Sequence, residues 1–476
     1  MLWLDDNDTI LFLGEGPGDR TQLYSLKCKS KELEKLTNSA SDLTSFGTTG
    51  SGEVIVYAAK NPVSPFLTES VKRKGIAVTS EDVTDLIRGR SSYGGNQLDD
   101  ASLFVKRLGQ EAERKIATQG RISGVFAPKM SLSPDGVHLF IQTEATQISN
   151  TWSEYEDQLQ QPAFRGSGLP GARTDIFQYE LVDTTTGASQ VVFDAPIPTL
   201  GSEMVWSPDS QSVVASDIYL SLNVDDSAER ELRKAHTFLV EFEIPSRQIT
   251  KISYEDLRLL NWDPKTGNVA CDAGRIDSLN GKTTPKAYFR KSGEAAWSKA
   301  SAPKQTGEPS LPDIVLDEGM NTPPHIVAID PSSGRKSLLM NLNIQFQNLA
   351  FARVEEITWK DSRGIEVKGG LYWPPDYVRG EKFPVVIQTH GWQSDRFWVD
   401  GPWATAFAAQ ALAGKGFFVL QVPDPDGHIW VTPKEAPGAM ASYQGAIDYL
   451  DRRGLIDRNR VGSRGLVGRT GTLRMR

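Results

Sequence analysis

The sequence predicts an all-β region followed by an α/β region, and two observations support this order. Residues 1 to about 350 contain short apolar or alternating runs separated by turn-forming residues, with little helical periodicity. After residue 351 strands alternate with helical stretches, which is typical of a parallel sheet covered by helices. The 476 residues are enough for about three domains of ordinary size. We therefore expect one domain over residues 1–350 and another over residues 351–476.

A hairpin turn recurs in the first region. Residues 133–136 read SPDG, residues 207–210 read SPDS and residues 262–267 read WDPKTG, each before an apolar run. Proline presets the first dihedral angle of such a turn, and Asp or Gly tolerates the next one. One acidic residue occurs in each hairpin, and these residues are Asp5, Asp135, Asp209 and Asp263. Because they recur with the turns, they are interpreted as turn caps rather than as calcium ligands.

Further strand pairs recur between these turns. Three of them occupy residues 177–187, 238–246 and 325–334, so that hairpins repeat at intervals of roughly 40–60 residues. Small sheets that repeat in this way and bury their faces against one another are typical of a β-propeller, here with about six or seven blades. An array of β-sandwiches is the alternative. A short helix expected over residues 81–88 interrupts the pattern.

The second region predicts a doubly wound sheet. A hairpin over residues 355–373 leads to strand 383–388, whose continuous apolar run indicates burial on both faces of a parallel sheet. A helix is expected over residues 402–413, a strand over 417–422 and a second helix over 439–453, where apolar residues recur at helical spacing. This alternation of strand and helix predicts an α/β domain.

Several phrases in this region resemble the prolyl oligopeptidase family of serine peptidases. They are GLYWPPDY at 370–377, FPVVIQTHG at 383–391, DGPW at 400–403, ASYQGAIDYL at 441–450 and GLIDRNRVG at 454–462. The resemblance implies a β-propeller followed by an α/β-hydrolase domain, which hydrolyses short peptides by acyl transfer with a Ser, an Asp and a His. RFWVDGP at 396–402 and NTPP at 321–324 resemble the branch that includes lasso-peptide isopeptidases.

The expected nucleophile is missing from the matching position. In this family it follows Arg-Val-Gly on a tight turn between a strand and a helix, where the strained backbone exposes the hydroxyl. Aligned without gaps, the position is Val467; aligned on the next Arg-Thr pair, it is Gly468, and neither side chain is a nucleophile. Ser463 comes too early for this turn and lacks its spacing, so we interpret it as part of a loop or a broken strand.

The resemblance therefore implies a partial hydrolase domain, truncated at the nucleophile strand. From residue 458 onward there are six Arg and no Asp or Glu, which suggests an interrupted reading frame near Gly462. Without the fifth strand, the edge of strand 383–388 would be unpaired, and residues 350–476 alone would be poorly soluble. We expect an inactive form of a serine peptidase that lacks Ser, Asp and His of the triad. The alternative is a non-catalytic propeller that binds peptides or proteins.

His390, Gly391 and Trp392 are the candidate functional residues. In the family the loop after this strand helps to form the oxyanion hole, so the resemblance places these three residues on the floor of the active site. The alternative is a strand-end turn in which Gly391 is needed for its backbone conformation. His428 is interpreted as a surface-loop residue rather than a general base, because spacing places no partner beside it.

Composition argues against other classes of protein. The 60 acidic and 52 basic residues give a net charge of -8 without the basic footprint of a nucleic-acid-binding protein, and the charge run 230–234 is interpreted as a solvated face. Cys28 and Cys271 lie far apart, so neither a disulfide framework nor a zinc site is expected, nor is any cofactor. The first residues lack an export signal, although relatives implied by the resemblance are cytosolic or exported. The most apolar stretch, 404–422, is too interrupted to cross a membrane, and the implied partner is a short peptide.

Overall fold

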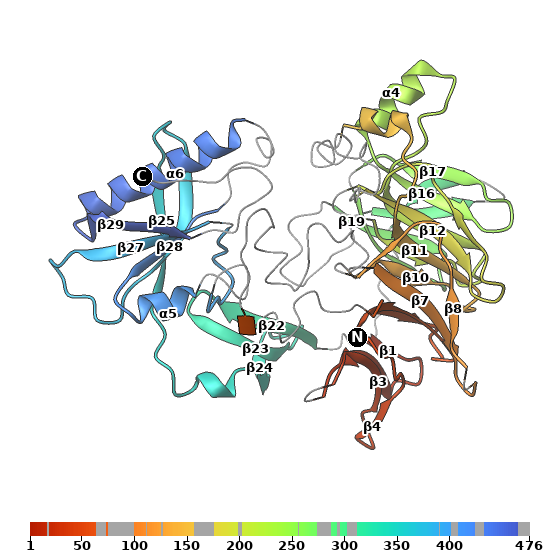
Figure 1. Cartoon of the computed structure of the whole chain (residues 1–476), viewed down its shortest axis with the longest axis horizontal. Coiled ribbons are helices and arrows are strands. Elements are labelled where there is room, and N and C mark those ends of the chain that lie inside the picture. The colour runs from red at the N-terminus through yellow and green to blue at the C-terminus, as the bar shows by residue number, and fades with distance from the viewer. Residues whose placement is uncertain are drawn as a thin grey trace. The chain divides into compact units, whose positions relative to one another are not determined.

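The computed structural model describes most of the chain, in two compact units (Figure 1). Unit 1 is Met1–Lys304 and unit 2 is Gln305–Arg476. The helix expected over residues 81–88 lies outside the described residues. The described part is the whole chain except residues 17–18, 63–72, 75–99, 111, 125–126, 157–175, 199–201, 256, 274–286, 293–295, 302–311, 390, 401–407, 424–432 and 465–476.

The described part of unit 1 forms five antiparallel sheets, in which neighbouring strands follow one another along the chain with one exception in the second sheet. The first sheet contains β1 (Leu2–Trp3), β2 (Thr9–Gly14), β3 (Gln22–Lys27) and β4 (Glu32–Lys35). The second contains β5 (Leu43–Thr48), β6 (Val54–Lys60), β7 (Asp100–Arg107) and β8 (Arg114–Ile116), with β9 (Ile122–Ser123) also paired to β7. The third contains β10 (Met130–Leu132), β11 (His138–Glu144), β12 (Phe177–Asp183) and β13 (Ser189–Val191). The fourth contains β14 (Met204–Trp206), β15 (Ser212–Ile218), β16 (Phe238–Glu243) and β17 (Ile249–Ser253). The fifth contains β18 (Leu257–Trp262), β19 (Asn268–Ala273), β20 (Ala287–Ser292) and β21 (Ala296–Ala300).

A sixth small antiparallel sheet begins the described part of unit 2. It contains β22 (Asp313–Gly319), β23 (Thr322–Ile329) and β24 (Lys336–Asn341), followed by the short 3-10 helix η4 (Ile344–Phe346). Consecutive sheets of this kind are the blades of a β-propeller, so the predicted fold of the first region is confirmed. The domain boundary at residue 350 stays a prediction. The last antiparallel strand, β24, ends before it, whereas the contact division falls between residues 304 and 305.

The recurring tetrapeptides close hairpins, as their sequences predict. In the first of them the N–H of Gly136 donates to the carbonyl of Ser133 at 2.9 Å, and the side chain of Asp135 accepts from the N–H of Val137 at 2.9 Å. Gly136 has φ +72°, and a Cβ at this position would lie 2.8 Å from a methyl group of Val54 on the neighbouring sheet. Asp209 and Asp263 accept backbone N–H groups of their own turns in the same way, which supports their interpretation as turn caps.

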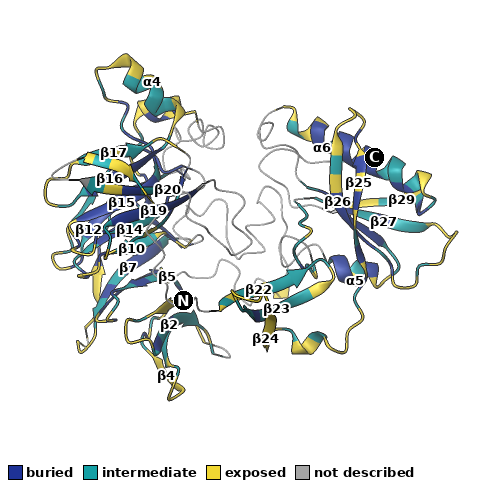
Figure 2. Cartoon of the chain, turned by 180° about the vertical axis from the view of Figure 1, so that it is seen from behind, coloured by how far each residue is buried: buried dark blue, intermediate teal, exposed yellow. Residues whose placement is uncertain are grey.

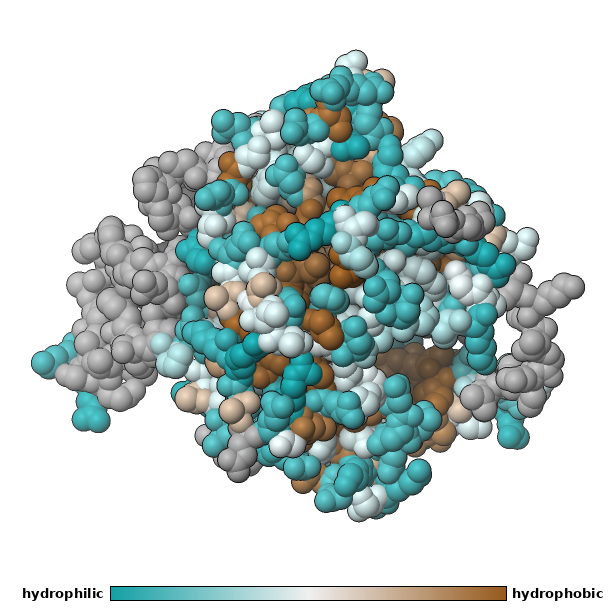
Figure 3. All heavy atoms as spheres, turned by 90° about the vertical axis from the view of Figure 1, so that its right-hand side faces the viewer, coloured by the Kyte–Doolittle hydropathy of each residue, from teal (hydrophilic) through white to brown (hydrophobic). Residues whose placement is uncertain are grey.

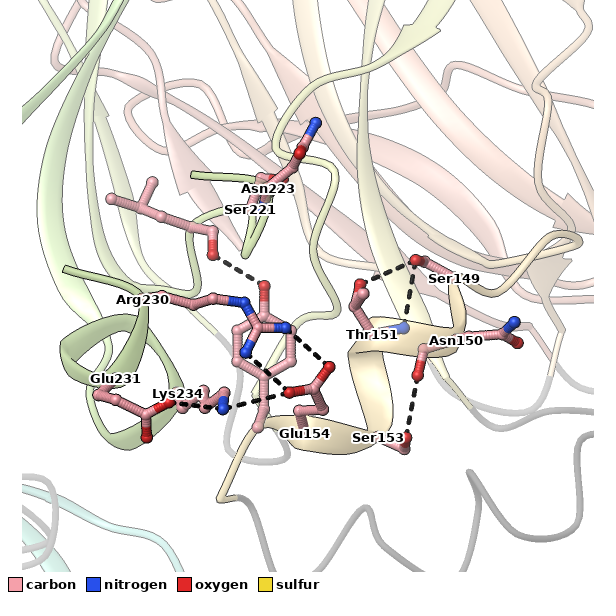
Figure 4. Close-up of polar contacts among 12 residues, drawn as sticks. Ser149, Asn150, Thr151, Ser153, Glu154, Ser221, Asn223, Arg230, Glu231 and Lys234 are labelled. Atoms are coloured by element: carbon pink, nitrogen blue, oxygen red, sulfur yellow. Dashed lines mark hydrogen bonds and ion pairs between the residues drawn. The ribbon is translucent and has the colours of Figure 1, made fainter. Parts of the chain in front are cut away.

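Two insertions in unit 1 are tied together by ion pairs (Figure 4). The 3-10 helix η2 (Asn150–Glu154) lies between β11 and β12, and α4 (Ser227–Ala235) lies between β15 and β16. The carboxylate of Glu154 accepts from both terminal nitrogens of Arg230, at 2.8 and 2.9 Å, and lies 3.2 Å from Nζ of Lys234. The charge run 230–234 therefore joins two insertions and is more than a solvated face. The sequence prediction missed α4, which is capped by Asp226.

The last sheet in the described part of unit 2 is mixed and has the strand order β25-β26-β28-β27-β29. Its strands are β25 (Val354–Lys360), β26 (Glu366–Tyr372), β27 (Phe383–Gln388), β28 (Phe418–Gln421) and β29 (Ile456–Arg464), with helices α5 (Ala409–Ala413) and α6 (Glu435–Arg452). Both helices were predicted, but α5 begins at Ala409, and residues 402–407 of the expected helix lie outside the described residues. β25 and β26 form the predicted hairpin, and β27 runs parallel to β28 and to β29.

The prediction that the edge of strand 383–388 is unpaired is wrong. β29 pairs in parallel with β27, with Ile387 opposite Ser463 and Val386 opposite Gly462. The prediction treated polar residues as incompatible with this strand, but backbone hydrogen bonds do not require apolar side chains, and Gly462 and Ser463 are exposed. Poor solubility of residues 350–476 is therefore no longer expected from this edge.

Alternate residues of β27 and β28 face two different layers. Val385, Ile387, Phe418 and Leu420 belong to one apolar cluster with Ala439, Tyr443 and Ala446 of α6. Val419 belongs to another cluster, with Tyr372 and with Ala409 and Ala413 of α5. Figure 2 shows buried residues concentrated along the strands, and Figure 3 shows apolar residues on one face of unit 1 in narrow bands among polar ones. The candidate active site lies in the layer of the sheet that packs against α5.

Candidate active site

The candidate active site lies at the carboxyl end of β27, where the chain turns toward α5. In an α/β sheet the loops at the carboxyl ends of parallel strands bind ligands, and β27 is flanked by two parallel strands. Of the three candidates, Gly391 and Trp392 are described and are partly buried. His390 lies outside the described residues, and so does His428.

Gly391 serves the turn that ends β27. Its φ is +106°, in the region that favours glycine, and its N–H donates to the carbonyl of Val422 at 3.1 Å. This bond links the ends of β27 and β28, which gives the strand-end-turn alternative direct support. Because the bond engages the N–H of Gly391, an oxyanion donor from this segment would have to be a neighbouring group. The oxyanion roles of His390, Gly391 and Trp392 stay predictions.

Trp392 packs against the backbone of β26. A Cβ added to Gly370 would collide with the indole ring of Trp392, so this contact requires glycine at residue 370. Gly370 pairs with Gln421 of β28, which places the indole next to the carboxyl ends of the central strands. The position of Trp392 is therefore fixed by a strand and not by the turn alone.

Two glutamines form a buried polar network beneath this turn. Gln388 and Gln421 end β27 and β28 in the same register, and each is 0% exposed. Nε2 of Gln421 donates to Oε1 of Gln388 at 3.1 Å and to the carbonyl of Asp400 at 3.3 Å. The hydroxyl of Tyr372 lies 3.2 Å from Oε1 of Gln421 and 3.1 Å from the carbonyl of Trp398. Burial raises the pKa of Tyr372, so that this hydroxyl remains a neutral donor.

The sequence contained a signal for this network that was not used. The apolar runs of both strands, FPVVIQ and FVLQ, end in Gln. A buried amide must find partners for its donors and acceptors, so two such residues at neighbouring strand ends indicate a polar floor. The network holds the carbonyls of Trp398 and Asp400 and therefore supports the segment above it.

Ser463 is not placed on a strand-to-helix turn. It lies inside β29, opposite Ile387, and is exposed. The register of β29 against β27 shifts between Ile456 and Val461, which is compatible with the interpretation as a broken strand. That Ser463 has no catalytic role stays a prediction. Val467 and Gly468 lie outside the described residues.

A cavity of about 380 Å³ opens among the strands of unit 1. Its wall includes β10, β14 and β18, with Met130, Phe140 and Met204 among its apolar residues. The hydroxyl of Tyr179 lines it near Ser202 and has no well-formed hydrogen bond to any described residue. Burial raises the pKa of Tyr179 to about 12, so the phenol is neutral. The sequence predicted no residue of this cavity as functional.

Metal and thiol chemistry have little support in the part of the chain that the structure describes. No three His, Cys, Asp or Glu side chains gather there in a way that could hold a metal ion. Cys271 is buried, and burial raises the pKa of its thiol to about 12, which makes it a poor nucleophile. None of the described helices combines the length and the apolar character that a membrane span needs.

Comparisons with known proteins agree with this architecture. No family model matches the chain. The lasso peptide isopeptidase AtxE2 of Asticcacaulis excentricus is 30% identical over 168 residues, which are 32% of this chain and 24% of that protein. The acylaminoacyl peptidase of Pyrococcus horikoshii has a similar fold, with a TM-score of 0.55 and 13% identity over 98% of this chain and 65% of that one. The match to a solved structure of AtxE2 covers 98% of this chain and 60% of that one, with 17% identity and a TM-score of 0.42.

The chain thus spans less than two thirds of each of these relatives. The likeness to the Pyrococcus enzyme shows the fold, and the sequence match adds kinship with an isopeptidase. Together they agree with the resemblance drawn from residues 370–462: part of this chain is similar in sequence to a lasso peptide isopeptidase, and the chain is similar in fold to an acylaminoacyl peptidase.

Proposed function

We propose that this chain comes from a serine-type peptidase that hydrolyses amide bonds in short peptides by acyl transfer. The strand order β25-β26-β28-β27-β29 carries the proposal. In the α/β-hydrolase architecture a nucleophile follows a central strand, and the loop of a neighbouring strand donates an N–H to the oxyanion. β29 and β27 stand side by side in this way, and Trp392 follows β27. The relative that cleaves lasso peptides supports a short peptide as the substrate class.

We further propose that this chain does not perform this reaction. The residues aligned with the nucleophile, Val467 and Gly468, have no hydroxyl or thiol, and Ser463 lies inside a strand that pairs with β27. Acyl transfer needs a nucleophile that is activated by a base within hydrogen-bonding distance. Peptide binding needs a binding pocket but no nucleophile, so a chain of this kind can bind a peptide without cleaving it.

An active-site serine probe tests this proposal. The full chain is treated with a fluorophosphonate, with AtxE2 as the positive control and heat-denatured chain as the negative control. We expect no labelling, together with binding of a short peptide in a titration. Labelling of any residue would contradict the inactive assignment, and a chain that binds no peptide would contradict the assigned substrate class.

The cavity in unit 1 favours a second function, that of a non-catalytic propeller that binds peptides. Apolar walls with a few polar groups are typical of ligand sites, and the hydroxyl of Tyr179 adds a donor. Met204→Trp would fill this cavity, whereas Gly370→Val would displace Trp392 at the sheet. Peptide binding that is lost in the first variant and kept in the second would favour the propeller site. The reverse result would favour the site at β27.

A further inference from the structure

The segment after Arg396 has its backbone held at four successive residues. The N–H of Phe397 donates to Oε2 of Glu318 at 3.1 Å, and the carbonyl of Trp398 accepts from the hydroxyl of Tyr372 at 3.1 Å. The carbonyl of Val399 accepts from the N–H of Gln410 at 2.9 Å, and that of Asp400 from the N–H of Ala409 at 3.1 Å. Residues 397–400 are the last residues of the turn that begins with Gly391 and Trp392.

Glu318 is the anchor that comes from outside the mixed sheet. It lies on β22, in the last antiparallel sheet, and its Oε1 accepts from Nη1 of Arg396 at 2.7 Å. The side chain of Glu318 is 10% exposed and that of Arg396 is 25% exposed. A carboxylate in these surroundings makes stronger hydrogen bonds than an exposed one, and leaving it unpaired is more costly. Glu318 thus ties both the side chain of residue 396 and the backbone of residue 397.

Glu318 stands opposite a β-bulge in the other strand of its hairpin. β22 and β23 pair regularly up to Asp317 opposite His325, and the next pair is Gly319 opposite Thr322. Between these two pairs β22 has one residue, Glu318, whereas β23 has two, Pro323 and Pro324. A bulge adds one residue to a strand and disrupts the ladder locally, and proline has no N–H to donate to it. Glu318 is thus the residue of β22 at which the regular pairing with β23 is interrupted.

The same hairpin is fastened to the mixed sheet at a second point. The side-chain amide of Asn321 donates to the carbonyl of Val354 at 2.9 Å and accepts its N–H at 2.8 Å. The rings of Phe346 and Phe351 pack against Phe397, with centroids 6.2 and 5.1 Å away. The hairpin therefore contacts β25 through Asn321 and contacts residues 396–397 through Glu318.

We propose that the hairpin of β22 and β23 positions the turn at the candidate active site, with Glu318 as the positioning residue. Residues 318 and 396 lie 78 positions apart, so the last antiparallel sheet would set the shape of a loop in the α/β part. The consequence for peptide recognition rests on the proposed function. The positioning of the turn by Glu318 does not rest on the proposed function, because it concerns the chain without any substrate.

Hydrogen exchange of the full chain tests the coupling. In Glu318→Ala we expect the amides of Phe397, Ala409 and Gln410 to exchange about 10- to 100-fold faster, because each of their hydrogen bonds belongs to the anchored segment. Asp317→Ala is the matched control. Asp317 is the preceding residue of β22 and pairs with Lys336 of β24 at 2.6 Å, and the variant should leave these amides unchanged. Unchanged exchange in Glu318→Ala, or equal acceleration in both variants, would overturn the proposal.

Glu318→Gln separates positioning from general stability. Its amide oxygen can still accept from the N–H of Phe397 but has lost the charge that pairs with Arg396, so we expect partial rescue of exchange at Phe397. Faster exchange across the whole sheet, with a lowered melting temperature, would indicate a merely structural role and would contradict the proposal. Probe labelling and peptide titration are measured separately, so the proposed function can fail while the coupling stands.

Discussion

Two glutamates hold distant segments together, one in each unit, and their surroundings differ. Glu154 joins η2 to α4 in unit 1 and has 37% of its side chain exposed, whereas Glu318 joins β22 to residues 396–397 in unit 2 and is 10% exposed. Glu154 pairs with the side chains of Arg230 and Lys234. Glu318 pairs with Arg396 and also accepts a backbone N–H.

We call each of these sets of ion pairs a tether, because it joins two segments that are distant in the sequence. The tether at Glu154 is exposed, whereas the tether at Glu318 is largely buried. Water and salt screen the charges of an exposed pair, so its loss changes stability little. An interior carboxylate or amide that loses a partner keeps its desolvation cost without the compensating hydrogen bond. We therefore expect unit 1 to tolerate changes at its tether and unit 2 to respond strongly to changes around the turn 391–400.

The largest effect is expected at the contact of Gly370 with Trp392. Gly370→Val would force the indole away from β26 and destabilise the chain by about 3 kcal/mol, the upper part of the usual range for overpacking. Denaturant unfolding followed by tryptophan fluorescence measures this. Gly462→Val is the matched control in the same sheet, because no atom of the described residues lies within 4 Å of a Cβ added there. Equal destabilisation by both variants would show that the Trp392 contact is not responsible.

The glutamine pair should give the next largest effect. Gln421→Leu removes a hydrogen-bond donor from Gln388 and from the Asp400 carbonyl, both of which stay buried, so we expect a loss of about 2 kcal/mol in the free energy of unfolding. In the double variant Gln388→Leu, Gln421→Leu the buried amide of Gln388 is gone as well. Its cost should therefore be smaller than the sum of the two single costs, and strict additivity in a double-mutant cycle would contradict this account.

A smaller effect is expected at the exposed tether. Glu154→Gln should lower the free energy of unfolding by less than about 1 kcal/mol, and the difference should shrink as salt is raised toward about 1 M. Urea unfolding at several salt concentrations checks this. Glu318→Gln in the same experiment sharpens the comparison, because its less exposed pair should be less sensitive to salt. A salt-independent effect at Glu154 would mean that exposure does not distinguish the two tethers.

The pH dependence of the same tether should be the smallest effect. Hydrogen bonds from Arg230 and Lys234 hold the pKa of Glu154 down to about 2, below its ordinary value of 4.5. Because the folded-state pKa is depressed, the stabilisation is complete above pH 4.5 and is lost as the pH falls toward 2. The difference in melting temperature between the wild type and Glu154→Gln should therefore vanish near pH 2. A difference that persists there would argue against this linkage.

Sequence patterns anticipated the features that depend on nearby residues. The turns at residues 133–136 and 207–210 follow from the conformations that Pro, Asp and Gly favour, and the propeller follows from their repetition. Helix α6 was expected from its apolar spacing, although it begins at Glu435, four residues earlier than predicted. In each of these cases, the residues that determine the structure are close together in the chain.

Features that depend on distant partners were missed or misread. The pairing of β29 with β27 was rejected because Gly462 and Ser463 are not apolar, although an edge position leaves such side chains exposed. The contact of Glu318 with Arg396 joins residues that no local rule pairs, because they lie 78 positions apart. Ion pairs of this kind depend on which surfaces meet, and a single sequence does not contain that information.

The bulge opposite Glu318 also restricts how this hairpin can evolve. Most short turns between strands accept an inserted or deleted residue, because the change remains at the surface. Here β23 has one residue more than β22 between two paired positions, and this extra residue sets the register of the two strands beside Glu318. Deletion of Pro323 or Pro324 would remove the bulge and shift β23 by one residue against Glu318. We therefore expect related sequences to vary less in length at this hairpin than at the other turns.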